Sequence, residues 1–175
     1  IHIREVSDSY AADGYLAIAP AIFDRQKTGV ELGYEGDDVS AGRDLKDSAS
    51  YEDAVKDLEA TVAELKIAGK IGSVGYCWGG TLSYRCGARI DDVVASVVYY
   101  GGQIIPFKDE IINGASLMHF GERDGGIPLD DVEAIKTAHP ESDVNIYPAD
   151  HGFNCDHRGS YDEVSCKLAR ERTDA

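Results

Sequence analysis

The sequence predicts an α/β fold in which a mainly parallel sheet carries helices on both faces. Apolar strand-like runs alternate with helix-like segments along most of the chain. These runs are continuously apolar rather than alternating, which is typical of parallel strands buried on both faces. One of them leads into a glycine-rich turn, after which a helix starts at once. No repeat or interdomain linker interrupts the pattern, so we expect residues 1–175 to form a single domain.

The first 69 residues are predicted to hold two clear helices, one short strand and a polar excursion with one weak helix. In chain order these are a helix over 2–12, a strand over 15–19, the excursion over 22–50 and a helix over 51–68. Ile3, Val6 and Tyr10 give the first helix its apolar face, and Gly69 is expected to cap the last one.

The remaining residues continue the alternation of strand and helix. The predicted elements are the strand before the glycine-rich turn, a helix over 79–89, strands over 93–100 and 117–121, a helix over 128–138, a strand over 144–147 and a helix over 161–171. In such a sheet, functional loops lie at the carboxyl ends of the strands. The residues that follow each strand are therefore the first candidates for a site.

Composition restricts the partners and the compartment. The 175-residue chain can bury one core, and its formal net charge of −15 would be repelled by nucleic acid or an anionic membrane surface. The sequence contains no run of about 18 apolar residues, so no transmembrane helix is predicted. The four cysteines form neither a C-x-x-C pair nor a secreted-type disulfide framework, which favours a cytoplasmic protein. The chain starts at Ile1 without methionine, so we expect a piece of a longer chain. Excess acid and a solvated excursion are compatible with a monomer or weak dimer.

The five residues before Gly80 read Gly-Tyr-Cys-Trp-Gly, which is the G-x-S-x-G nucleophile elbow with cysteine in place of serine. An elbow holds its nucleophile on a strained backbone, and the strand and helix must approach closely around it. Gly75 and Gly79 are small enough for this approach, and Gly80 adds room. The turn would present the Cys77 sulfur above the sheet and direct the Trp78 amide to a developing oxyanion. A plain glycine-rich turn with a buried cysteine is the alternative.

An acid and a histidine follow two later strands. Asp124 comes after the strand over 117–121, and His151 comes after the strand over 144–147. Nucleophile, acid and histidine thus occur in the chain order of the α/β-hydrolase triad. An imidazole can take the proton of Cys77, and a carboxylate can orient that imidazole. The alternatives are a turn-forming aspartate before glycine and a surface histidine.

Several segments together resemble the dienelactone hydrolases, which are carboxymethylenebutenolidase-like proteins of the α/β-hydrolase superfamily. The matching segments are 11–15, 19–20, 23–26, 75–80, 99–101, 119–124 with Pro128, and 151–154. The resemblance implies a carboxylic ester hydrolase in which Cys77, Asp124 and His151 cleave a small ester or enol-lactone through an acyl-thiol intermediate, without a cofactor. It also implies that the family's first three strands, with a second oxyanion donor, are missing from this chain.

The resemblance is weaker where the family binds its substrate. Dienelactone hydrolases proper hold the substrate carboxylate with two arginines. At those positions this chain has Val39-Ser40 and Cys155, with Arg43 and Arg158 a few residues further on. The resemblance therefore implies the reaction class rather than that particular substrate. The Trp78 amide is expected to stabilise the oxyanion. The Trp78 indole, Tyr76 and Phe153 are expected to contact the substrate.

Other interpretations of the candidate residues remain open. The run from Asp150 to His157 could be a metal cluster, but no second half-site accompanies it, so no metal is predicted. Cys155 and Cys86 are expected to be small buried residues, and His119 a core histidine with satisfied hydrogen bonds. The alternative functions are a non-catalytic binding module and a thiol-redox protein that uses Cys77 and Cys155.

Overall fold

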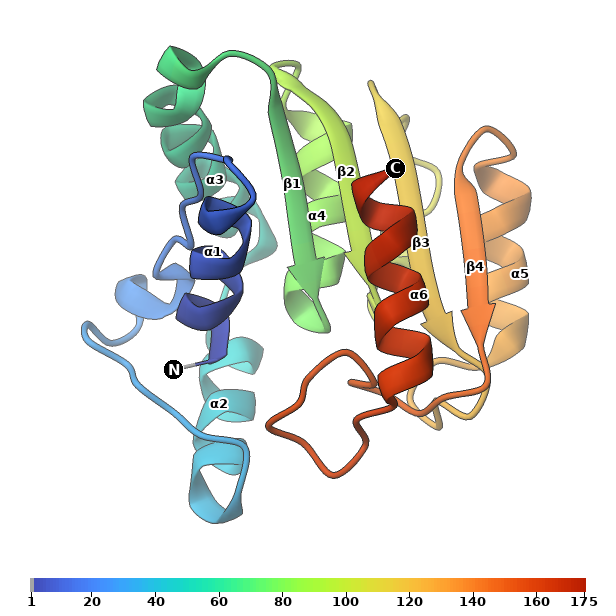
Figure 1. Ribbon diagram of the computed structural model, residues 1–175. Coiled ribbons are helices and arrows are strands. Elements are labelled where there is room, and N and C mark those ends of the chain that lie inside the picture. The colour runs from blue at the N-terminus through green and yellow to red at the C-terminus, as the bar shows by residue number, and fades with distance from the viewer. Residues whose placement is uncertain (1) are drawn as a thin grey trace. The chain divides into compact units, whose positions relative to one another are not determined.

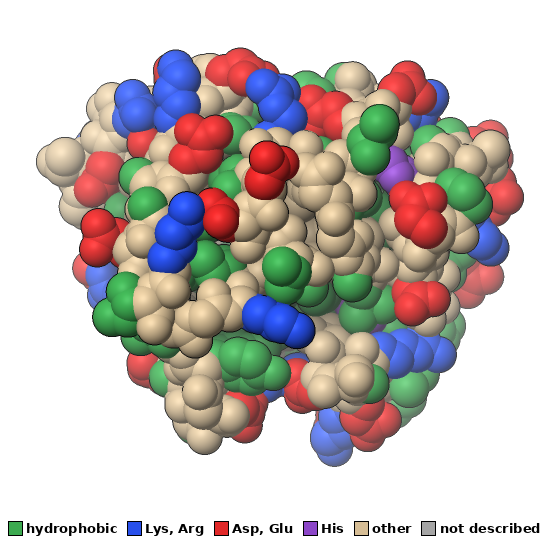
Figure 2. All heavy atoms as spheres, turned by 90° about the horizontal axis from the view of Figure 1, so that it is seen from above, with side chains coloured by type: hydrophobic (Ala, Val, Ile, Leu, Met, Phe, Trp, Pro, Cys, Tyr) green, Lys and Arg blue, Asp and Glu red, His purple; other side chains and the backbone are tan. Residues whose placement is uncertain are grey.

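A computed structural model of the protein describes residues 2–175. The chain divides into two compact units, Ile1–Gly69 and Lys70–Ala175 (Figure 1). That these units make up one domain stays a prediction. No helix among the described residues is both long and apolar enough to cross a bilayer. Acidic side chains are spread over the face drawn in Figure 2, with Lys and Arg between them, rather than gathered into one patch.

The first unit is helical, as the periodicity predicts. Its helices are α1 (His2–Ala12), α2 (Gly36–Ser48) and α3 (Tyr51–Leu65), with short 3-10 turns at Ile22–Arg25 and Lys66–Ala68. The side chain of Ser50 caps α3 by accepting a hydrogen bond from the Asp53 amide at 3.3 Å. Gly69 ends the segment with a φ of +108°, a backbone conformation that glycine adopts without strain.

The strand predicted over residues 15–19 is wrong. That stretch is irregular chain, and Tyr15, Leu16 and Ile18 are 60%, 55% and 45% exposed. A strand is held by ladder hydrogen bonds to a neighbouring strand. Among the described residues, none of the four strands pairs with this stretch. Apolar content without a pairing strand therefore does not make residues 15–19 a strand.

The second unit is a parallel sheet with helices on both faces, as the sequence predicts. Its strands are β1 (Ile71–Tyr76), β2 (Val93–Tyr99), β3 (Ala115–Gly121) and β4 (Asp143–Tyr147), and its helices are α4 (Trp78–Arg89), α5 (Leu129–Ala138) and α6 (Glu163–Asp174), with a 3-10 turn at Ile105–Phe107. The strands lie in the order β1-β2-β3-β4, and every pair is parallel. Helix α6 covers one face, and α4 and α5 cover the other (Figure 1). Predicted boundaries differ from these by at most three residues, the largest difference being at the end of α6.

The core of this unit lies where the strand ends converge. Val98, Met118 and Phe120 are fully buried on β2 and β3, and Ile135 of α5 packs into the same cluster. Since all four strands run the same way, their carboxyl ends meet at one edge of the sheet. The loops that carry the predicted site residues leave the sheet at this edge.

His119 is a core histidine, as expected, and it links β3 to the C-terminal helix. Its Nδ1 lies 2.8 Å from the Tyr147 hydroxyl, and its Nε2 lies 3.1 Å from Thr173 Oγ1 on α6. Thr173 donates to the Ala169 carbonyl, so its oxygen accepts from its other partners, Nε2–H of His119 and the Tyr99 hydroxyl. Arg172 donates to the Tyr147 hydroxyl at 3.0 Å, and that hydroxyl can in turn donate its own proton to Nδ1 of a neutral imidazole. Burial, together with the charge of Arg172, lowers the pKa of His119 to about 4.

Candidate active site

The turn between β1 and α4 has the geometry of a nucleophile elbow. Cys77 lies at its apex with φ +56° and ψ −118°, a strained conformation for a residue with a side chain. A Cβ on Gly75 would overlap the Gly79 carbonyl, and one on Gly80 would lie 2.6 Å from the Tyr99 carbonyl oxygen. A Cβ on Gly79 would meet no described atom within 4 Å. Gly75 and Gly80 are thus the sterically required glycines, whereas the expectation that Gly79 must itself be small is wrong.

The elbow places the Cys77 sulfur at the start of a helix. The Cys77 amide donates to the Tyr99 carbonyl at 3.0 Å, which ties the turn to β2. The Trp78 amide hydrogen bonds to the Cys77 sulfur. Cys77 itself is exposed. The amino end of a helix favours negative charge, so this position suits a thiolate.

Asp124 and His151 are joined side chain to side chain. His151 Nδ1 lies 2.6 Å from Asp124 Oδ2, and the Asp124 carboxylate is fully buried. The other carboxylate oxygen, Oδ1, accepts from the Gly126 amide at 2.9 Å. The carboxylate is therefore fixed from two sides. With Nδ1 engaged, His151 has Nε2 left for Cys77, with which it also hydrogen bonds.

The charges of Cys77 and His151 stabilise each other. Burial alone would lower the pKa of His151, but its hydrogen bonds to Asp124 and Cys77 raise that pKa to about 9. Desolvation by the surrounding protein would by itself raise the pKa of the Cys77 thiol. Its hydrogen bond to His151, the imidazolium charge, the Trp78 amide and the charge of Arg158 together lower that pKa below its ordinary value. The pair is thus suited to exist as thiolate and imidazolium.

The structure brings Cys77, Asp124 and His151 together, as the chain order suggests. The three residues predicted to contact the substrate differ in how deeply they are buried. Tyr76 is half-buried with its ring 4.8 Å from that of Tyr99, and Trp78 is half-buried at the start of α4. Phe153 is fully buried, and its ring centroid lies 5.1 Å from that of Tyr147. Its position is typical of a core residue below the site.

Two residues near this group were not predicted as site residues. Tyr100 follows β2, and its ring centroid lies 5.0 Å from that of His151. The guanidinium of Arg158 packs over Gly152, where an added Cβ would be 2.7 Å from Arg158 Nη1. The sequence places Tyr100 inside the predicted strand over 93–100, so its position after β2 was not foreseen. The signal for Arg158 was a cationic residue close in sequence to His151.

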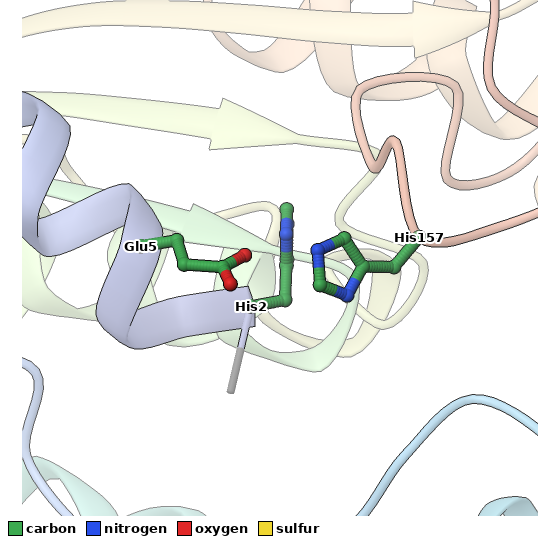
Figure 3. A group of neighbouring side chains, drawn as sticks. All are labelled: His2, Glu5 and His157. Atoms are coloured by element: carbon green, nitrogen blue, oxygen red, sulfur yellow. The ribbon is translucent and has the colours of Figure 1, made fainter.

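The remaining candidates have simpler roles. Cys86 and Cys155 are buried, as expected for small core residues. His157 Nε2 lies 3.8 Å from Asp156, and both side chains are partly exposed. Figure 3 draws His2 and Glu5 on the first turn of α1 and His157 on the loop before α6. His2 and Glu5 belong to the first unit, and His157 belongs to the second.

A parallel sheet with a nucleophile elbow at the end of β1 defines the class of α/β hydrolases. The sequence pattern of the "Dienelactone hydrolase family" matches residues 1–174, and the chain belongs to this family. It is a carboxylic ester hydrolase.

Individual relatives agree with this assignment. The chain is 40% identical to a "Putative carboxymethylenebutenolidase" of Synechocystis over 91% of its length and 73% of that protein. It is 29% identical to the "Carboxymethylenebutenolidase" of Pseudomonas putida, over 97% of this chain and 76% of that one. A crystal structure titled "Putative Dienelactone Hydrolase" from Klebsiella pneumoniae superposes with a TM-score of 0.87 at 28% identity, covering 98% of this chain and 78% of that one.

Proposed function

We propose that this protein hydrolyses a small ester or enol-lactone with Cys77 as nucleophile, His151 as general base and acid, and Asp124 as the group that orients His151. The observation that carries the proposal is the continuous connection from the buried Asp124 carboxylate through His151 to the Cys77 sulfur. The pKa of His151, raised to about 9, and the lowered pKa of Cys77 support a thiolate that exists before substrate binds.

Each step then has a group to perform it. The thiolate attacks the ester carbonyl carbon, a carbon–sulfur bond forms, and the carbonyl π electrons move to oxygen. The oxyanion collapses, the carbon–oxygen bond to the leaving group breaks, and the His151 imidazolium supplies a proton to the departing oxygen. Neutral His151 next takes a proton from water, whose oxygen attacks the acyl-thiol. The carbon–sulfur bond then breaks, which releases the acid and restores the thiolate.

The backbone around Cys77 supports one oxyanion donor. The Cys77 amide is already bonded to the Tyr99 carbonyl, whereas the Trp78 amide is directed at the sulfur. We therefore assign oxyanion stabilisation to the Trp78 amide. The half-buried rings of Tyr76 and Trp78 are proposed to contact the acyl group, and we assign Phe153, which is fully buried, to the packing beneath His151.

Arg158 is a candidate for binding a negatively charged substrate. Its charge acts on Cys77, and its guanidinium packs over Gly152, directly after His151. A guanidinium here could pair with a substrate carboxylate, a role that the family resemblance gives to arginines at other positions. We propose that Arg158 favours acidic lactones over neutral esters.

The four free cysteines support the further proposal of a reducing, cytoplasmic location.

The proposed function is tested by ester turnover in matched cysteine variants. Full-length protein is assayed with p-nitrophenyl acetate and with a dienelactone. Cys77→Ala should abolish turnover of both, while Cys166→Ala, which changes a partly buried cysteine on α6, should keep the rate of the unaltered protein. Undiminished turnover in Cys77→Ala would exclude the triad. No turnover in the unaltered, folded protein would favour a non-catalytic binding module.

A further inference from the structure

Tyr100 has an unusual backbone for a large aromatic residue. Its φ is +40°, and among the described residues 2–175 only Cys77 shares a positive φ without being glycine. A bulky side chain is strained in this region of backbone space and persists there only where the surroundings enforce it. Both strained residues stand directly after neighbouring parallel strands, Cys77 after β1 and Tyr100 after β2.

The surroundings of Tyr100 hold this conformation in place. Its amide donates to the His119 carbonyl at 2.7 Å, so the backbone stays bonded to β3 although the strand itself has ended. A Cβ on the next residue, Gly101, would lie 2.8 Å from a Val98 side-chain atom and 3.0 Å from an Ile104 atom. The turn therefore needs glycine directly after Tyr100. It directs the Tyr100 ring into the protein, where the residue is only 2% exposed.

The buried ring lies between the catalytic histidine and the core. Its centroid is 5.0 Å from that of the His151 imidazole, with an angle of 57° between the planes. On another side it meets Phe153 at 5.4 Å in an edge-on contact. Phe153 is fully buried, so the Tyr100 ring rests on a rigid support.

We propose that Tyr100 is a positioning residue that holds the His151 imidazole in line between Asp124 and Cys77. The inference rests on the proposed function, because it acts through His151. The four strand ends would then supply one functional residue each: Cys77 after β1, Tyr100 after β2, Asp124 after β3 and His151 after β4.

The physical reason is that two hydrogen bonds do not fix an imidazole plane. His151 can tilt about the line between Asp124 and Cys77 unless a neighbouring group opposes the motion. An aromatic ring at 5.0 Å opposes it by contact and excludes water from that side of the imidazole. A ring also attracts a cation, which favours the imidazolium form.

The groups that set the ionisation of the pair are few. Cys77 is affected by His151, Arg158, the Trp78 amide and the amino end of α4, and His151 is affected by Asp124 and Cys77. Tyr100 adds no charge to either. If its ring is lost, the His151–Cys77 hydrogen bond should loosen and the pKa of Cys77 should rise towards its ordinary value.

The test is the pH dependence of Cys77 alkylation by iodoacetamide, with the modified peptide identified by mass spectrometry. In Tyr100→Phe the ring remains, and the profile should match that of the unaltered protein. In Tyr100→Leu the rate at mildly acidic pH should fall about tenfold, which corresponds to a rise of about one in the pKa of Cys77. Phe120→Leu is the matched control, because Phe120 is also a fully buried aromatic residue of the same core cluster, on β3.

The outcomes separate the inference from the proposed function. An ordinary Cys77 pKa in the unaltered protein would contradict the thiolate–imidazolium pair itself. A lowered pKa of Cys77 that stays the same in Tyr100→Leu, or that rises equally in Phe120→Leu, would overturn only the role of Tyr100. If Tyr100→Leu does not fold, Tyr100→Gly removes the ring while accepting a φ of +40° without strain, and the same criteria apply.

Discussion

The imidazole of His151 is bonded through Nδ1 to Oδ2 of Asp124 at 2.6 Å, and the carboxylate that makes this bond has no solvent exposure. A buried carboxylate cannot turn to water when the imidazole moves, so it fixes which nitrogen bears the proton. The second oxygen of Asp124 is committed to the Gly126 amide at 2.9 Å. The direction in which Nε2 of His151 points is thus determined by the Asp124 carboxylate and by the Gly126 amide that holds this carboxylate.

The substitution Asp124→Asn should remove this control while keeping the size of the side chain. The new carboxamide would present either its oxygen or its NH₂ group to His151, so the imidazole loses its anionic partner. We expect kcat to fall about 10²- to 10⁴-fold, as for orienting carboxylates in similar triads. Steady-state ester hydrolysis measures this, and circular dichroism confirms that the variant is folded. A loss below tenfold would contradict the orienting role.

The elbow makes opposite predictions for its two flanking glycines. Gly75→Ala should destabilise the protein by about 3 kcal/mol or more, because the added methyl would overlap the Gly79 carbonyl. Gly79→Ala should be neutral or slightly stabilising, because its methyl meets no described atom within 4 Å and alanine is the better helix former. Urea unfolding of the two variants compares these effects. Equal destabilisation by both would contradict the described geometry of the turn.

Arg158→Gln should separate substrate binding from chemistry. If the guanidinium meets a substrate carboxylate, the variant should raise KM for a dienelactone about tenfold or more, since a charge-assisted hydrogen bond contributes about 1.5–3 kcal/mol. Hydrolysis of the neutral p-nitrophenyl acetate should change much less. Arg170→Gln is the control, because Arg170 pairs with Asp174 at 2.7 Å on α6. A similar loss of activity on both substrates would contradict substrate binding by Arg158 and leave it only the role of stabilising the Cys77 thiolate.

Acid should destabilise the fold through His119. Its pKa in the folded protein is about 4, against an ordinary value of 6.5, so the unfolded chain binds the proton first as the pH falls. The stability that the neutral form provides is complete above pH 6.5 and is lost towards pH 4, by about 3 kcal/mol. His151 contributes a constant amount below pH 6.5, because its folded pKa is raised to about 9.

Urea unfolding between pH 7 and 4 checks this expectation. His119→Gln should be less stable at pH 7, since it disrupts the bonds to Tyr147 and Thr173, but its stability should fall less towards acid. An unchanged acid dependence in His119→Gln would show that other groups cause it.

Much of the second unit could be predicted from its sequence because local pattern and tertiary structure agree there. Continuous apolar runs predicted the four strands, and the order of Cys77, Asp124 and His151 on successive strand ends placed them at one edge of the sheet. Residues 15–19 were mispredicted for the opposite reason. Strand formation depends on a pairing partner, which composition does not reveal.

The role of Tyr100 could not be predicted because it depends on a single backbone angle. A sequence that favours a strand up to residue 100 does not reveal that the chain turns to a φ of +40° at its last residue. The partners of His119 were hidden similarly, since Thr173 lies 54 residues away and is brought close by α6. For a histidine that is expected to be buried, we can predict from the sequence that its ring nitrogens have hydrogen-bond partners, but not which residues these partners are.

The most direct test of the account is to trap the acyl-enzyme. The unaltered protein is mixed with p-nitrophenyl acetate, quenched in acid within the first turnover and analysed by peptide mass spectrometry. We predict an acetyl group on the Cys77 sulfur, which forms within the first turnover and disappears once the substrate is consumed. Acetylation of another residue, or turnover with no acyl group on Cys77 at any time, would contradict the central claim that Cys77 is the nucleophile.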